Sequence, residues 1–126
     1  MARLLIVDDD RASLDLRQAI LSRHGHKVAT ACDPTEARHS FSETAPEAVI
    51  LDLRLPEPAD GLALIREFRA ASATLRIIVL SGWPQDLEGK TEAALVDAVF
   101  GKPIRMEKLT ATLSQFWPQS PTEPRA

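Results

Sequence analysis

The stretch Leu4-Leu5-Ile6-Val7-Asp8-Asp9 decides the fold, because a short apolar run stops abruptly at carboxylates. Four apolar residues in a row, without polar alternation, are typical of a strand buried on both faces. From residue 10 to residue 23 the pattern becomes helical, and Asp10 is well placed as the N-cap. The apolar stripe of this helix is predicted to consist of Ala12, Leu16, Ala19 and Ile20.

The same alternation repeats along the chain. Further strands are predicted at residues 28–31, 48–51, 77–80 and 97–100. Helices are predicted to begin at Pro34, after Gly61, near Pro84 and near Met106. The helix over residues 84–95 is the weakest, because Gly89 inside it costs about 1 kcal/mol relative to alanine. Strict alternation predicts the α/β class: a single doubly wound (βα)5 domain with a five-stranded parallel sheet.

Composition narrows the class of protein further. The 126 residues suit one domain, and 44% hydrophobic with 26% charged residues is the composition of a globule. A net charge of -3 argues against a broad basic surface for nucleic acid. The first apolar run is too short for a signal peptide or a membrane span. A single cysteine excludes an internal disulfide. For both reasons we expect a cytoplasmic protein. We predict a domain over residues 1–117 and a Pro-rich, disordered tail over residues 118–126.

Chemistry-bearing side chains follow four of the five predicted strands. Asp8 and Asp9 follow the first, Asp52 the third, Ser81 the fourth and Lys102 the fifth. Because the carboxyl ends of parallel strands meet at one edge of the sheet, these side chains are expected to converge. Converging carboxylates repel one another, and a hard divalent cation, Mg²⁺ or Mn²⁺, relieves that repulsion. A cation, an ammonium and a hydroxyl together suit a phosphoryl group, which a carboxylate can accept as an acyl phosphate.

These residues, with Leu53-Arg54-Leu55-Pro56, Asp60-Gly61, Gly82 and Pro103, resemble the receiver (CheY-like) domain of two-component response regulators. The resemblance extends over residues 3–117 and implies the flavodoxin-like strand order 2-1-3-4-5. It also implies that Asp52 accepts a phosphoryl group from a histidine kinase or histidine phosphotransfer protein. Such a domain catalyses only its own phosphorylation and dephosphorylation, so we do not expect a conventional enzyme.

The resemblance assigns the remaining site residues as well. The metal ligands would be Asp8, Asp9, Asp52 and the backbone carbonyl of Arg54. Lys102 and Ser81 would bind the phosphoryl oxygens, Gly82 would leave their path open, and the bond before Pro103 would be cis. Asp60 is predicted to be a turn or cap residue rather than a ligand. For Trp83, packing at the mouth of the site and simple exposure remain equally open.

One position departs from the family pattern. Val99 lies where the family usually has the tyrosine or phenylalanine that moves inward on phosphorylation. The neighbouring Phe100 cannot replace that ring, because adjacent strand residues face opposite sides of a sheet. The loop between Pro56 and Asp60 also has one residue more than is common.

Three functions follow from the pattern. The first is a stand-alone response regulator that switches contacts with an unknown output protein, as a monomer or weak homodimer, without binding nucleic acid or membrane directly. The second is a phosphorelay intermediate or phosphate sink. The third is a degenerate receiver that acts as a constitutive interaction module; the intact set of charged site residues argues against it.

Overall fold

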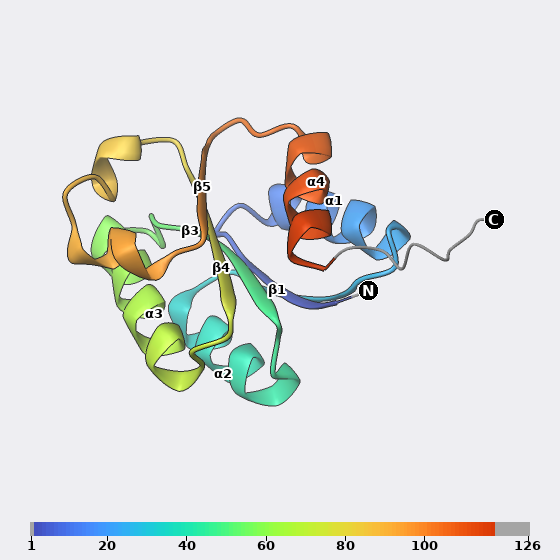
Figure 1. Ribbon diagram of the computed structural model, residues 1–126, viewed down its shortest axis with the longest axis horizontal. Coiled ribbons are helices and arrows are strands. Elements are labelled where there is room, and N and C mark those ends of the chain that lie inside the picture. Colours follow the sequence, from blue (N-terminus) through green and yellow to red (C-terminus); the bar gives the residue numbers. More distant parts are fainter. Residues whose placement is uncertain (1, 118–126) are drawn as a thin grey trace.

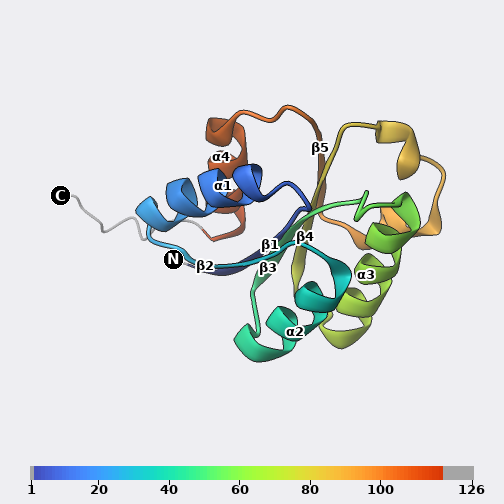
Figure 2. The same ribbon diagram turned by 180° about the vertical axis from the view of Figure 1, so that it is seen from behind.

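The parallel sheet lies at the centre of the protein, with helices on both of its faces (Figure 1; Figure 2). The structure is a computed structural model and describes residues 2–117, so the predicted tail over residues 118–126 lies outside the described part. The strands are β1 (Arg3–Val7), β2 (Lys27–Ala31), β3 (Ala48–Asp52), β4 (Arg76–Ser81) and β5 (Ala98–Gly101). They are parallel and run in the order β2-β1-β3-β4-β5, which confirms the α/β class and the strand order.

Alternate residues of the three central strands, β1, β3 and β4, serve two separate cores. Ile6, Ile50 and Ile78 pack toward α1 (Arg11–Arg23) and α4 (Met106–Phe116). Their neighbours, including Leu5 and Val49, pack on the opposite face toward α2 (Pro34–Thr44) and α3 (Pro58–Ala71). Figure 1 shows these two helix pairs on either side of the sheet. Burial on both faces explains why the strand sequences are continuously apolar.

The predicted apolar stripe of α1 is wrong. Ala12, Leu16 and Ala19 are exposed and Ile20 is only half-buried, with Leu16 60% exposed. The helix instead buries Leu14 and Leu21. The positions between them on that face are polar: Gln18 donates to the Val28 carbonyl at 3.2 Å, and Arg17 pairs with Asp8. These two side chains interrupted the pattern that would have revealed the buried face.

The segment between β4 and β5 also differs from expectation. No α-helix forms over residues 84–95; two short 3₁₀ helices, η1 (Pro84–Asp86) and η2 (Thr91–Leu95), take its place. Gly89, between them, has a φ of 74°, a left-handed conformation that favours glycine and interrupts a right-handed helix. The described domain therefore has four α-helices rather than five.

The start of α3 fits closely against the loop that follows β3. Glu57 and Asp60 form a capping box, in which the Glu57 amide donates to Asp60 Oδ2 at 3.0 Å, so the predicted cap role of Asp60 is confirmed. The Gly61 amide donates to the Leu53 carbonyl at 2.9 Å. A Cβ atom at residue 61 would lie 2.4 Å from Leu53 Cα, so only glycine fits here. None of the helices within residues 2–117 has the length and apolar character that a membrane span requires.

Candidate functional site

Three carboxylates meet at the carboxyl edge of the sheet. Because β1 and β3 pair with Val7 opposite Leu51, Asp8 and Asp52 emerge side by side from the strand ends. Each of Asp8, Asp9 and Asp52 contributes one carboxylate oxygen, and these three oxygens lie within 4.8 Å of one another. Asp8 is 1% exposed, Asp52 is half-buried and Asp9 is open to solvent. The cluster therefore has a buried floor and an accessible mouth.

Lys102 links two of these carboxylates. Its Nζ lies 2.7 Å from Asp52 Oδ2 and 3.1 Å from Asp8 Oδ2. β5 carries it there, and the Lys102 amide donates to the Ser81 carbonyl at 2.9 Å. Burial lowers the pKa of Lys102, but the hydrogen bond with Asp52 and the charges of Asp52 and Asp8 raise it more, so its net pKa lies above its ordinary value. The Lys102–Pro103 peptide bond is cis.

Arg17 is a second cation in the cluster, and the sequence reading missed it. Its Nη1 lies 2.9 Å from Asp8 Oδ2, and its side chain is only 12% exposed. It reaches the site from α1, on the face that also carries Leu14 and Leu21. Residues 14, 17, 18 and 21 share one face of α1, but two of the four are polar, so apolar periodicity alone did not identify this face.

Asp10 takes no part in the cluster. Its side chain accepts from the Ala12 amide at 3.2 Å and from the Ser13 hydroxyl at 2.8 Å, which caps α1 as predicted. The hydrogen bond from Ser13 is the largest cause of a pKa for Asp10 below its usual value. Its own amide donates to Asp8 Oδ1 at 2.9 Å, so the turn that begins α1 also orients Asp8.

Ser81 lies at the end of β4 with its hydroxyl turned into its own loop. The hydroxyl donates to the Trp83 carbonyl at 2.9 Å and accepts from the Trp83 amide at 3.0 Å. Ser81 is 2% exposed, whereas Gly82 is exposed and a Cβ there would contact nothing within 4 Å. Of these two residues, only Ser81 has a polar side chain, and in this structure its hydroxyl is hydrogen-bonded to the backbone of Trp83.

Arg54 and Trp83 form a cover beside the cluster. The Arg54 guanidinium lies 3.8 Å from the centre of the Trp83 ring and pairs with Asp86, Nε to Oδ2 at 2.8 Å. Trp83 is 48% exposed, and the contact of its ring is with Arg54 rather than with the carboxylates of the cluster. The hydrogen bond from Arg54 holds the pKa of Asp86 below its usual value. The Arg54 amide lies 3.3 Å from Asp52 Oδ1, which connects this cover to the cluster.

Val99 and Phe100 face opposite sides of the sheet, as expected from strand geometry. Val99 is 44% exposed and lies beside Leu87 and Ala93. Phe100 packs on the other face, where Lys108 Nζ lies 5.6 Å from its ring centre. No aromatic side chain of strand β5 therefore lies on the side that Val99 occupies.

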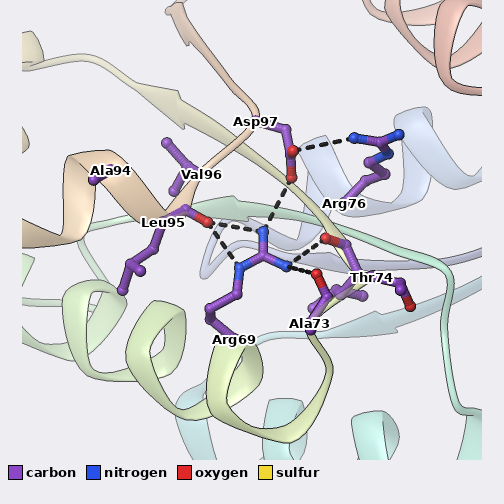
Figure 3. Close-up of a pocket in the computed structure, with 9 residues that line it drawn as sticks. Arg69, Ala73, Thr74, Arg76, Ala94, Leu95, Val96 and Asp97 are labelled. Atoms are coloured by element: carbon purple, nitrogen blue, oxygen red, sulfur yellow. Dashed lines mark hydrogen bonds and ion pairs between the residues drawn. The ribbon is translucent and has the colours of Figure 1, made fainter.

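A pocket of about 380 Å³ lies away from the cluster, at the amino ends of β4 and β5 (Figure 3). Arg69 dominates it and donates to carbonyl oxygens of the loop between α3 and β4, including Leu75 at 2.7 Å. It also donates to the Leu95 carbonyl at 2.8 Å and to Asp97 at 3.1 Å. These bonds hold η2 and the start of β5 against α3, so this pocket is a structural junction.

The donor set of the cluster fits a divalent cation of the magnesium type. All of the clustered side-chain donors are carboxylate oxygens, the ligands that Mg²⁺ and Mn²⁺ prefer. Asp9 lies at the open side, where a hydrated ion can enter. An ammonium lies within hydrogen-bonding distance of two of the same carboxylates. Such an arrangement can hold a metal and an anionic group together.

A family model and the sequence relatives both place the chain among response regulators. The family model described as the response regulator receiver domain matches residues 4–114. The virulence transcriptional regulatory protein PhoP of Salmonella typhimurium is 34% identical over 116 residues, which cover 90% of this chain and 50% of PhoP. Response regulator MprA of a Mycobacterium species is 35% identical over 88% of this chain and 48% of MprA. The chain thus spans about half the length of these relatives.

Solved structures agree with the sequence relatives. A CheY-like response regulator receiver domain from Methylobacillus flagellatus superposes with a TM-score of 0.80 and 32% identity, covering 91% of this chain and 98% of that one. Response regulator TrrA from Thermotoga maritima, solved in complex with Mg²⁺ and BeF, gives a TM-score of 0.81 and 25% identity over the same shares of the two chains.

Proposed function

The chain belongs to the response regulator receiver domain family, and on that premise we propose that Asp52 accepts a phosphoryl group from a donor phosphohistidine. The donor would be a histidine kinase or a histidine phosphotransfer protein. The observation that carries the proposal is the position of Lys102 Nζ, 2.7 Å from Asp52 Oδ2 and 3.1 Å from Asp8 Oδ2, beside a third carboxylate. We expect the reaction to take place in the cytoplasm.

The transfer needs an in-line nucleophile and compensation of charge. An oxygen of Asp52 attacks phosphorus, the P–N bond of the donor breaks, and its electron pair stays on the histidine nitrogen, which then takes a proton. Lys102 already lies against Asp52 and would stabilise the phosphoryl oxygens as they arrive. Asp8, Asp9, Asp52 and the carbonyl of Arg54 would hold Mg²⁺, which supplies positive charge at those oxygens.

Ser81 would couple phosphorylation to a change of shape. A hydroxyl has one hydrogen to donate, and here the Trp83 carbonyl receives it at 2.9 Å. When that hydrogen turns to a phosphoryl oxygen, the carbonyl loses its donor. Trp83 is stacked on Arg54, so the change would reach the cover formed with Asp86. This route requires no ring at Val99, and its output is a changed contact with a protein partner.

The test is phosphorylation of the purified chain. With Mg²⁺ and acetyl phosphate, or with a phosphorylated histidine kinase, intact-mass spectrometry should show one added phosphoryl group. Asp52→Asn should remain unmodified, and Asp15→Asn, which changes an exposed aspartate of α1, should behave as the wild type. Full modification of Asp52→Asn would refute the assignment of the acceptor.

A phosphorelay intermediate or phosphate sink remains the second candidate. The two 3₁₀ helices in place of an α-helix before β5, and the valine at position 99, favour it because both alter the region expected to report phosphorylation. Phosphorylation without any change in Trp83 fluorescence, followed by transfer to a histidine phosphotransfer protein, would support this candidate over the protein-contact switch.

A further inference from the structure

Arg17 is a largely buried cation that the proposed phosphoryl transfer does not use. Its guanidinium comes from α1 and lies 2.9 Å from Asp8 Oδ2. Both side chains are withdrawn from solvent, Arg17 at 12% and Asp8 at 1% exposure. A pair so shielded interacts more strongly than a surface ion pair.

Asp8 has its acceptor capacity engaged on both oxygens. Oδ2 faces two cations, since Lys102 Nζ also lies 3.1 Å from it. Oδ1 accepts from the Asp10 amide at 2.9 Å. A divalent cation that approaches Oδ2, directly or through a bound water, must therefore compete with two cationic side chains that are already in place.

The charge of the cluster leads to the same conclusion. Asp8, Asp9 and Asp52 carry three negative charges, and Lys102 with Arg17 carries two positive charges, which leaves one net negative charge. Without Arg17 two net negative charges would face the ion. Attraction for a divalent cation scales with that charge, so Arg17 weakens it at short range.

We propose that Arg17 is an internal counterion that sets the affinity of the site for its divalent cation. The inference rests on the metal site of the proposed function. Arg17 stabilises Asp8 when the metal is absent and opposes the metal when it binds. By linkage, metal binding must weaken the Arg17–Asp8 pair by the same free energy with which that pair weakens metal binding.

This role separates Arg17 from a merely structural residue. Loss of a structural contact lowers stability and leaves metal affinity unchanged or weaker. Loss of a counterion lowers the stability of the metal-free protein and tightens metal binding. The two effects have opposite signs in one variant, so a single comparison distinguishes them.

The experiment is a MgCl₂ titration of the full chain, followed by the amide chemical shifts of residues 8–10 and by the melting temperature in EDTA and in Mg²⁺. Arg17→Met should bind Mg²⁺ about tenfold more tightly than the wild type, because a unit charge against a ligand carboxylate is removed. It should melt lower in EDTA and gain more from Mg²⁺. Arg23→Met removes an exposed charge about 9 Å further along the same helix and should keep the wild-type Kd.

If Arg17→Met does not fold, Arg17→Gln, which is polar and less disruptive, replaces it in the comparison with the wild type. Arg17→Lys keeps the charge and should stay near the wild-type Kd. Unchanged or weaker Mg²⁺ binding by the folded Arg17 variants, with normal binding by the wild type, would overturn this inference alone. No Mg²⁺ binding by any variant would overturn the metal site and the inference together.

Discussion

Replacement of Gly61 by alanine gives a prediction whose sign depends on the structure. In an open helix this change stabilises by about 0.5–1 kcal/mol, because glycine loses more backbone entropy on folding. Here the new Cβ would lie 2.4 Å from Leu53 Cα and Leu53 O, about 1 Å closer than ordinary contact. Both atoms belong to the backbone that follows β3, so no side chain can rotate away.

Overpacking of a rigid site costs about 1–3 kcal/mol, so we expect Gly61→Ala to lower the free energy of unfolding by about 2 kcal/mol. For a chain of this length that is a fall in melting temperature of about 8 °C. Urea unfolding followed by circular dichroism measures the free energy, and calorimetry measures the temperature. The same displacement should slow phosphorylation, because residues 53 and 54 follow Asp52.

Gly82→Ala is the matched control for stability. It adds the same methyl group beside the same site, but nothing lies within 4 Å of the new Cβ, so we expect a change below about 0.5 kcal/mol. A Gly61→Ala protein as stable as the wild type, or more stable, would refute the argument that backbone contact requires glycine here.

Three further predictions concern the ion pairs. Arg69→Met removes the hydrogen bonds that join the α3–β4 loop to the Leu95 carbonyl and to Asp97, and it should lower the free energy of unfolding by about 2–4 kcal/mol in urea. Arg38→Met, in an exposed pair, should change it by less than about 1 kcal/mol. Arg54 lowers the pKa of Asp86, so the contribution of this pair to stability is present above the ordinary carboxyl pKa and is lost only as pH falls through the lowered value. Trp83 fluorescence, measured in a Trp117→Phe background, should therefore change only in that acidic range. A change near pH 6 would contradict this prediction. Lys102→Met should stay folded, because Asp8 keeps Arg17, yet phosphorylation of Asp52 should slow at least about 100-fold in an acetyl phosphate assay; an unaltered rate would exclude its proposed role.

The strands and the edge that holds the site could be read from the sequence. Each strand is a short apolar run, and a parallel sheet places the residues that follow, such as Asp8, Asp52 and Lys102, at one edge. That deduction needs only the period of the strands and the direction of their pairing. It is robust because the three central strands, β1, β3 and β4, bury both of their faces.

The details that failed depend on contacts made after the strands assemble. Arg17 and Gln18 are polar, so no pattern of apolar residues marks the buried face of α1; only the presence of Asp8 and the Val28 carbonyl explains their position. Gly89 signalled a weak helix, but its left-handed φ, which divides the segment into two 3₁₀ turns, is a property of the folded loop. The hydroxyl of Ser81 likewise finds a partner in its own loop, at Trp83.

A crystal structure of the chain with Mg²⁺ and beryllofluoride tests the central claim most directly. We predict beryllium bonded to an oxygen of Asp52, Lys102 Nζ on a fluoride, and Mg²⁺ held by the carboxylates at residues 8, 9 and 52. Carboxylates that move apart around an empty cluster, at concentrations of both ions that saturate other receivers, would contradict the account.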